Sequence, residues 1–301
     1  MYTRFGDNDI VNRQAQELVT STWSNNLNNL QAQYTASTVD FTQATSSGNF
    51  YIEVLNQNAT SSTAETQYFV SYGHRLGSGS PDFTHDTGSF GLSPSRVIYN
   101  QYRQLHFNDD TKFFTFGTHT PDDIFVINIA RGRYKQRLTL GSLNLFVSGG
   151  TNGVAGQTKI HLTDDSVTNP EGAGTSNLGT YYNVVSGSNG VVLGGTTATT
   201  QIKGSGSYGY FYPEAGLIIL NGGAFATGSA LEPTRGQSLG NNTDQNHYNF
   251  WKHMSASGHF IVDTTEEINS EFYFCRTRND QFNYTNNESF IDANKNIRFE
   301  S

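Results

Sequence analysis

Four cations at alternate positions, Arg131, Arg133, Lys135 and Arg137, are the residues of this chain whose type and spacing most clearly suggest a role. They follow a run of β-favouring apolar residues at 123–130. If a strand continues through them, all four lie on one face. Such a face must meet solvent, an acidic neighbour or a phosphate. We predict a partner contact here, with a solvated strand end or turn as the alternative.

Two short motifs match signatures of other protein classes, but the surrounding sequence lacks what those classes need. Residues 86–88 read Asp-Thr-Gly, the aspartic-protease triplet, but that chemistry needs a second facing carboxylate and the chain has no second copy of the motif. Residues 204–209 match the dinucleotide-binding loop, yet a strand and a proline follow where that fold needs a helix. We interpret both as loops.

The chain shows no spacing typical of a metal site. The Asp pairs at 109–110, 122–123 and 164–165 lack the pattern of a calcium loop, and turn capping explains them better. His247 and His253 lack zinc-ligand spacing. We therefore predict no catalytic residue, no metal, no cofactor and no enzymatic activity.

Composition narrows the class of protein further. The chain has 301 residues and a formal net charge of -8, the opposite of a nonspecific nucleic-acid binder. The N-terminus has no apolar signal core and no window is long enough for a membrane span. Cys275 is the one cysteine, so no internal disulfide can form, and we expect a buried structural thiol. We expect neither nucleic acid nor membrane as a partner.

The fold class follows from glycine, aromatic and polar content. With 31 Gly, 13% aromatic and 15% charged residues, the chain suits many short strands joined by tight turns. We predict a mainly β fold with a minor helical part. It would be a β-sandwich or barrel-like body of short antiparallel strands, with a few short helices and an extended N-terminal arm. The strands are expected at 50–55, 66–72, 112–117, 123–130, 142–147, 157–163, 181–185, 191–193, 208–212, 217–220, 258–263 and 266–276.

Two helices are expected. Val97, Ile98, Tyr102 and Leu105 share one helical face, with Ser95 as a plausible cap. A short helix is possible at 245–254, and residues 10–30 could form another, although their β-branched residues weaken that expectation.

The chain divides by apolar content. Residues 1–48 hold few large hydrophobic residues and are predicted to form an arm that packs on its own body or on a neighbouring subunit. Residues 49–301 form the β-rich body, with a Gly-, Ser- and Thr-rich hairpin insertion at 164–207.

Several segments together resemble a family of virion structural proteins from contractile-tailed bacteriophages, especially those of marine cyanobacteria. The segments that carry this resemblance are 69–75, 97–103, 123–137, 143–145, 162–166, 210–216, 266–276 and 282–284. The most distinctive read Tyr-Phe-Tyr-Pro-Glu-Ala-Gly at 210–216 and Glu-Phe-Tyr-Phe-Cys-Arg at 271–276. None is a catalytic signature.

The resemblance implies a non-enzymatic structural component of the tail, at the baseplate or tail tip, in a virion assembled in the host cytoplasm. Its partners would be other virion proteins and copies of itself in a symmetric assembly. It also implies that the family's members continue beyond the point at which this chain ends. A capsid or neck position is one alternative. Another is a carbohydrate- or receptor-binding module, because the many aromatic residues and Asn-rich loops suit sugars. A hydrolase is the third.

Overall fold

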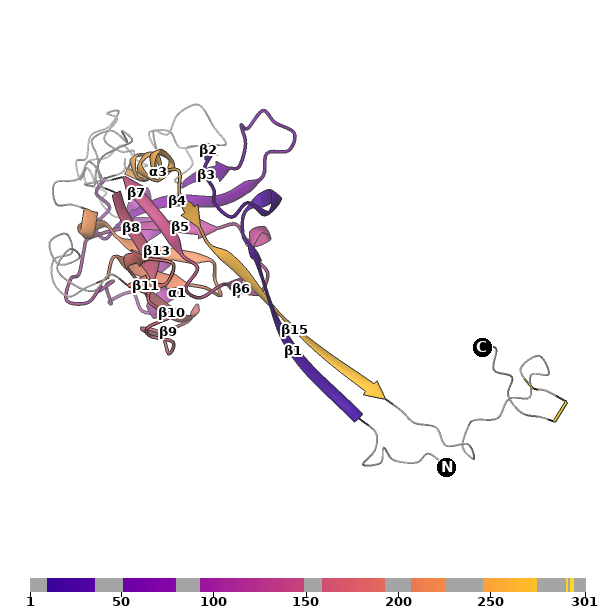
Figure 1. Cartoon of the computed structure of the whole chain (residues 1–301). Coiled ribbons are helices and arrows are strands. Elements are labelled where there is room, and N and C mark those ends of the chain that lie inside the picture. The colour runs from indigo at the N-terminus through magenta and orange to yellow at the C-terminus, as the bar shows by residue number, and fades with distance from the viewer. Residues whose placement is uncertain are drawn as a thin grey trace. The chain divides into compact units, whose positions relative to one another are not determined.

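The computed structural model describes residues 10–35, 51–79, 93–148, 159–192, 207–225 and 246–274, together with 291 and 293–294. The fold is mainly β, as predicted, with a curled antiparallel sheet that forms a half-barrel. Figure 1 shows the strands of this sheet side by side. The aspartic-protease-like triplet at 86–88, the first three residues of the glycine motif (204–206), and Cys275 lie outside the described residues.

The main sheet is antiparallel at each pairing between its described strands. Its order is β14-β7-β8-β10-β12-β13-β5-β4-β3-β2, and β9 and β11 pair with β10. The bounds are β2 Tyr34–Thr35, β3 Tyr51–Leu55, β4 Thr66–His74, β5 Asp123–Ile129, β7 Asn144–Ser148, β8 Lys159–Asp164, β9 Gly174–Ser176, β10 Gly179–Ser188, β11 Val191–Val192, β12 Gly209–Tyr212, β13 Leu217–Asn221 and β14 Phe260–Ile261.

Strand β5 shows why the apolar run at 123–130 is continuous. Phe125 and Ile127 enter one hydrophobic core, while Ile124 and Val126 enter a second core on the opposite face of the sheet. Strand β13 alternates in the same way. A strand covered on both faces reads as an unbroken apolar segment, whereas a half-exposed strand alternates with polar residues.

Helix α1 (Pro94–Phe107) covers part of the second core. It begins after Ser93, which occupies the N-cap position predicted for Ser95, and ends at Asn108 in the left-handed conformation. The expected apolar face is confirmed for Ile98, which is buried, and for Tyr102, which packs on the second core, but Val97 and Leu105 are exposed. Helix α1 lies close to β4 at Gly73, and this contact directs Tyr99 rather than Val97 towards the sheet.

Helix α3 (Asn246–Ser257) confirms the short helix expected at 245–254. Its Phe250 and Met254 enter the first core. The strand expected at 112–117 is absent: Phe114 and Phe116 are buried in the second core, and Phe116 makes only an isolated bridge to His119. Aromatic side chains that alternate in and out can therefore belong to a loop packed on a sheet.

The described part of the N-terminal region is extended where a helix was possible, and it packs on the chain's own body, one of the two arrangements expected for the arm. Residues 10–21 form strand β1 (Ile10–Ser21), and a short 3-10 turn, η1 (Ser24–Asn26), follows. Trp23 and Leu30 are buried in the first core of the body. The Leu30 amide donates to the carbonyl oxygen of Phe260 at 3.0 Å. Residues 22–35 therefore belong to the body.

A second sheet has the order β1-β15-β6, with β15 at Asp263–Phe274 and β6 at Arg137–Leu138. The chain forms two compact units, residues 19–266 and residues 1–18 with 267–301. We call the paired strands β1 and β15 the terminal ribbon. Strand β6 pairs only with Thr264 and Thr265, so most of β15 has β1 as its described neighbour.

The segment at 164–207 is more than an insertion. It supplies β10, which lies between β8 and β12 inside the main sheet. Its glycines permit close approaches: a Cβ atom at Gly187 would lie 2.2 Å from the carbonyl oxygen of Val191. A Gly- and Ser-rich segment can therefore form an interior strand when its neighbours leave no room for larger side chains.

Candidate functional site

The predicted basic face is not formed as expected. Strand β5 ends at Ile129, and Arg131–Arg133 form a 3-10 turn, η2, so the strand does not continue through the four cations. Arg131 stacks on the Tyr134 ring at 4.6 Å and donates to the Tyr134 carbonyl oxygen at 2.7 Å. Lys135 and Arg137 are exposed. The turn thus separates the four cations into different environments.

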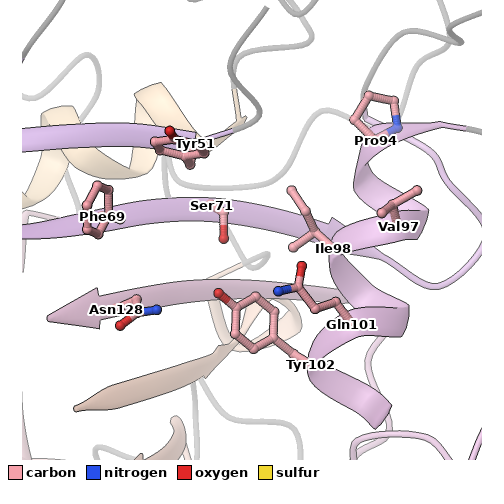
Figure 2. A pocket seen from close by; sticks show the side chains of 9 residues that line it. All are labelled: Tyr51, Phe69, Ser71, Pro94, Val97, Ile98, Gln101, Tyr102 and Asn128. Carbon is pink, nitrogen blue, oxygen red and sulfur yellow. The ribbon is translucent and has the colours of Figure 1, made fainter. Parts of the chain in front are cut away.

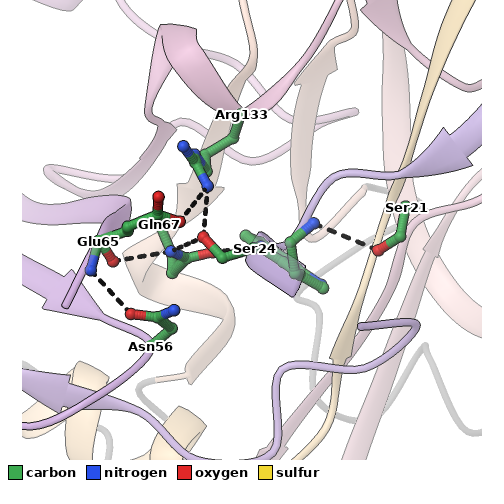
Figure 3. A network of polar contacts seen from close by, with 7 residues as sticks. Ser21, Ser24, Asn56, Glu65, Gln67 and Arg133 are labelled. Atoms are coloured by element: carbon green, nitrogen blue, oxygen red, sulfur yellow. Dashed lines mark hydrogen bonds and ion pairs between the residues drawn. The ribbon is translucent and has the colours of Figure 1, made fainter. Parts of the chain in front are cut away.

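Arg133 is an internal partner of the body. Figure 3 shows its guanidinium beside Glu65 and Ser24, and the ion pair to Glu65 is 2.9 Å long. The guanidinium also donates to the Ser24 hydroxyl, and Gln67 Nε2 donates to the same oxygen at 2.7 Å. The Ser24 hydroxyl, followed by the Arg133 charge, holds the pKa of the Glu65 carboxyl below its ordinary value. This network fastens residue 24 of the N-terminal segment to the body.

The paired Asp residues serve local structure. Asp109 accepts from the Thr111 amide at 2.8 Å, and Asp122 forms an ion pair of 2.6 Å with Arg75. Asp164 accepts from the Gly141 and Leu143 amides at 2.9 Å and 3.2 Å. Capping of turns and loops, the interpretation made from sequence, describes the contacts of Asp109 and Asp164, whereas Asp122 forms an ion pair instead.

Asp123 is buried and pairs with other polar residues of the sheet. The Tyr72 hydroxyl donates to Asp123 Oδ1 at 2.6 Å, and His74 Nε2 lies 3.5 Å from the same atom. His74 Nδ1 accepts from the Leu76 and Ser78 amides at 3.0 Å and 3.2 Å. Because both ring nitrogens of His74 are used in this way, the ring is held as part of the structure.

The described residues contain no group of three or more His, Cys, Asp and Glu side chains that could hold a metal ion. His253 Nδ1 lies 2.7 Å from the Ser148 carbonyl oxygen. Burial lowers the pKa of His247 to about 4, and its ring makes no hydrogen bond among the described residues. In the described part of the chain, no helix is long and apolar enough to cross a membrane.

The terminal ribbon exposes large apolar side chains. Leu18, Ile268, Phe272 and Tyr273 are between 42% and 57% exposed. Neighbouring residues of a strand point to opposite faces, so Phe272 and Tyr273 place aromatic rings on both faces of the ribbon. An ion pair of 2.7 Å between Arg13 and Glu271 connects the two strands.

A groove lies where α1 leaves part of the sheet uncovered, and we call it the α1–β4 groove. Its volume is about 450 Å³, within the range of ligand sites. Figure 2 shows its lining side chains, which come from α1 and from β3, β4 and β5. They are Tyr51, Phe69, Ser71, Pro94, Val97, Ile98, Gln101, Tyr102 and Asn128.

The register of the sheet sets the floor of this groove. Asn128 lies opposite Phe69, and Ser71 lies opposite Tyr51. The Tyr51 and Phe69 rings are 5.6 Å apart at 80°. Burial raises the pKa of Tyr102, while hydrogen bonds with Asn128 and Ser71 act in the opposite direction. The Tyr102 hydroxyl therefore reaches the polar side chains of the floor.

Sequence reasoning did not find this groove, because its residues come from three distant segments. One signal was available: Asn128 interrupts the apolar run of β5, and Ser71 interrupts that of β4. A polar residue in a strand that is otherwise buried can mark a place where the covering layer is incomplete, although Gln67 and Asp123 in the same strands are fully covered.

No protein-family model, no curated protein and no solved structure matches this chain.

Proposed function

We propose that this protein is a non-enzymatic structural assembly protein of a tailed-phage virion, a tail or baseplate component that contacts copies of itself and other virion proteins. The placement in a virion rests on the segments that resemble that family. The observation that carries the assembly role is the terminal ribbon, which exposes apolar side chains on both faces.

A two-stranded ribbon has too little buried surface to be stable by itself in water. Leu18 and Val19 lie on opposite faces of β1, as do Phe272 and Tyr273 of β15, and all four are exposed. A partner that covers both faces would remove these side chains from water, at about 25 cal/mol per Å² of apolar surface. Ribbons from other copies of the chain offer a matching surface, because each carries the same apolar side chains.

The charges of the ribbon suit a partner as well. Strand β15 carries Glu266, Glu267 and Glu271, while Lys135 and Arg137 are exposed on the body. Opposite charges on different copies would set the register of the assembly more than its strength, since exposed pairs contribute only about 0.2–1 kcal/mol.

The test is the mass of the full chain in solution, measured by sedimentation equilibrium. We expect an oligomer for the natural chain and a monomer for the double variant Leu18→Ser with Phe272→Ser. The matched control replaces Val167 and Val191 by Ser, since both are 65% exposed on the body. A natural chain that stays monomeric at tens of micromolar, or a ribbon variant that keeps the natural mass, would contradict the proposal.

A further inference from the structure

We infer that the α1–β4 groove is a binding site for a neutral saccharide. The site lies within the body and is separate from the assembly contacts of the terminal ribbon. Its lining consists of neutral side chains alone: aromatic and aliphatic groups together with hydroxyls and amides.

The described lining of the groove has no charged side chain, and this indicates that the ligand is uncharged. None of the nine described lining residues is Asp, Glu, Lys, Arg or His. A charged ligand would lose its hydration on entering and gain no opposite charge, which is unfavourable. Glu53, two residues from Tyr51 in β3, accepts a hydrogen bond from Thr66 and would further disfavour an anion. The ligand is therefore expected to be neutral.

The aromatic side chains give the groove two apolar surfaces at right angles. Tyr51 is 46% exposed, and its ring stands at 80° to that of Phe69. The face of an aromatic ring is the negative end of its quadrupole. The C–H face of a sugar ring carries slight positive charge and is flat, so it packs on such a surface. Val97, 54% exposed on α1, extends the apolar wall.

The polar side chains of the groove can both donate and accept hydrogen bonds. Ser71 and Tyr102 offer hydroxyls, and Gln101 and Asn128 offer amides. Sugar hydroxyls also donate and accept, so each can meet a partner in this set. Figure 2 shows these groups arranged from the sheet floor to the helix wall. Tyr102 already bonds with Asn128 and Ser71, but an apolar ligand would cover the exposed Gln101 amide without giving it a partner, at a cost.

A peptide is a less suitable occupant. Peptides that bind to sheets commonly add a strand to a free edge. The groove lies on the face of the sheet, where β4 pairs with both β3 and β5 and offers no free edge. A sugar needs only side-chain contacts, which is what this face provides.

The test titrates the full chain, by calorimetry, with di- to tetrasaccharides of glucose, galactose, mannose and N-acetylglucosamine. Oligomers of galacturonic acid and an uncharged decapeptide are the comparison ligands. We expect at least one neutral saccharide to bind with a Kd of about 1 mM or tighter. Tyr51→Ala and Gln101→Glu should each weaken that binding at least about tenfold.

Gln104→Glu is the matched control, because Gln104 is exposed one turn further along α1 and does not line the groove. It should bind as the natural chain does, and so should the ribbon variant, even where assembly is lost. Melting curves check that Tyr51→Ala and Gln101→Glu fold. Failure of every neutral saccharide to bind, binding unchanged in both groove variants, or binding of the peptide or the acid alone would overturn the inference.

Discussion

The backbone nitrogen of Tyr99 in α1 lies 2.9 Å from the point that a Cβ atom at Gly73 of β4 would occupy. Contacts as short as this do not occur for real Cβ atoms without movement. Glycine at position 73 therefore sets the distance between α1 and the sheet, and with it the depth of the α1–β4 groove.

Replacing Gly73 by Ala should destabilise the protein by about 1–3 kcal/mol, because the added methyl group displaces α1 or Ile124. The free energy of unfolding in urea measures this effect. Gly132→Ala is the control, since a Cβ atom there would meet nothing within 4 Å. Equal stability of the two variants would show that α1 can move at little cost.

Residues 19–35 of the N-terminal segment should stabilise the body, whereas residues 1–18 should not. Removal of residues 1–18 should leave the melting temperature of the body nearly unchanged. Removal of residues 1–35 should destabilise it severely, because Trp23 and Leu30 leave the first core. The loss of Trp23 alone is worth about 3–5 kcal/mol. Circular dichroism melts of both truncations decide the matter, and a stable body without residues 1–35 would refute the prediction.

Acid should destabilise the protein partly through His247. Burial lowers the pKa of its imidazole to about 4, whereas an unfolded chain binds that proton near pH 6.5. Between these values the unfolded state binds more protons, so stability is fully present above about pH 6.5 and is lost as the pH falls towards 4. The loss is on the order of 3 kcal/mol for a shift of this size.

His247→Leu should therefore flatten the dependence of unfolding free energy on pH between about 4 and 6.5. It should cost little at neutral pH, because the ring makes no hydrogen bond among the described residues. Urea titrations at a series of pH values measure both effects. An unchanged slope would mean that His247 is not kept neutral by its surroundings.

Arg133 should contribute more to stability than Lys135 and Arg137, the exposed cations of the same stretch. Arg133→Ser should destabilise the protein by about 1–2 kcal/mol, because the Glu65 ion pair and a hydrogen bond to Ser24 are lost. Lys135→Ser and Arg137→Ser should each change stability by less than about 0.5 kcal/mol. The cost of Arg133→Ser should shrink in acid: the pKa of Glu65 is lowered in the folded state, so its contribution is lost as the pH falls through that value.

A second measurement separates folding from assembly. Under the proposed function, Lys135→Glu with Arg137→Glu should reduce incorporation into particles while leaving the melting temperature nearly unchanged. The control is Lys112→Glu, which lies on another exposed part of the body. Normal incorporation of the double variant would remove Lys135 and Arg137 from the contact surface.

The strands of the body could be predicted because burial on one or both faces leaves a direct pattern in the sequence. The apolar run of β5 and the alternation of β3 are examples. The continuation through Arg131 could not be excluded, since alternate cations also suit a strand. Strand β5 ends where η2 (Arg131–Arg133) turns the chain and Arg133 pairs with Glu65.

The role of residues 22–35 was hidden for a related reason. They contain few hydrophobic residues, so the sequence did not indicate that any of them would be buried in the core. Yet Trp23 packs on Phe260 with ring centroids 4.8 Å apart, and its indole nitrogen donates to the Phe260 carbonyl oxygen at 2.8 Å. One large side chain that packs on a segment far away in the sequence produces no periodic pattern of apolar residues. The groove was hidden in the same way, because it depends on where α1 stops covering the sheet.

The pairing of β1 with β15 has a consequence for synthesis. Strand β1 leaves the ribosome roughly 250 residues before its partner, which at about 5–20 residues per second is a delay on the order of ten seconds to a minute. During that time Leu18 and Val19 belong to an unpaired strand, and neighbouring nascent chains on one messenger carry the same strand. Arg13 and Glu17 interrupt the apolar residues of β1. Such charges oppose premature pairing between chains, so they should matter more for the yield of correctly folded protein than for its final stability.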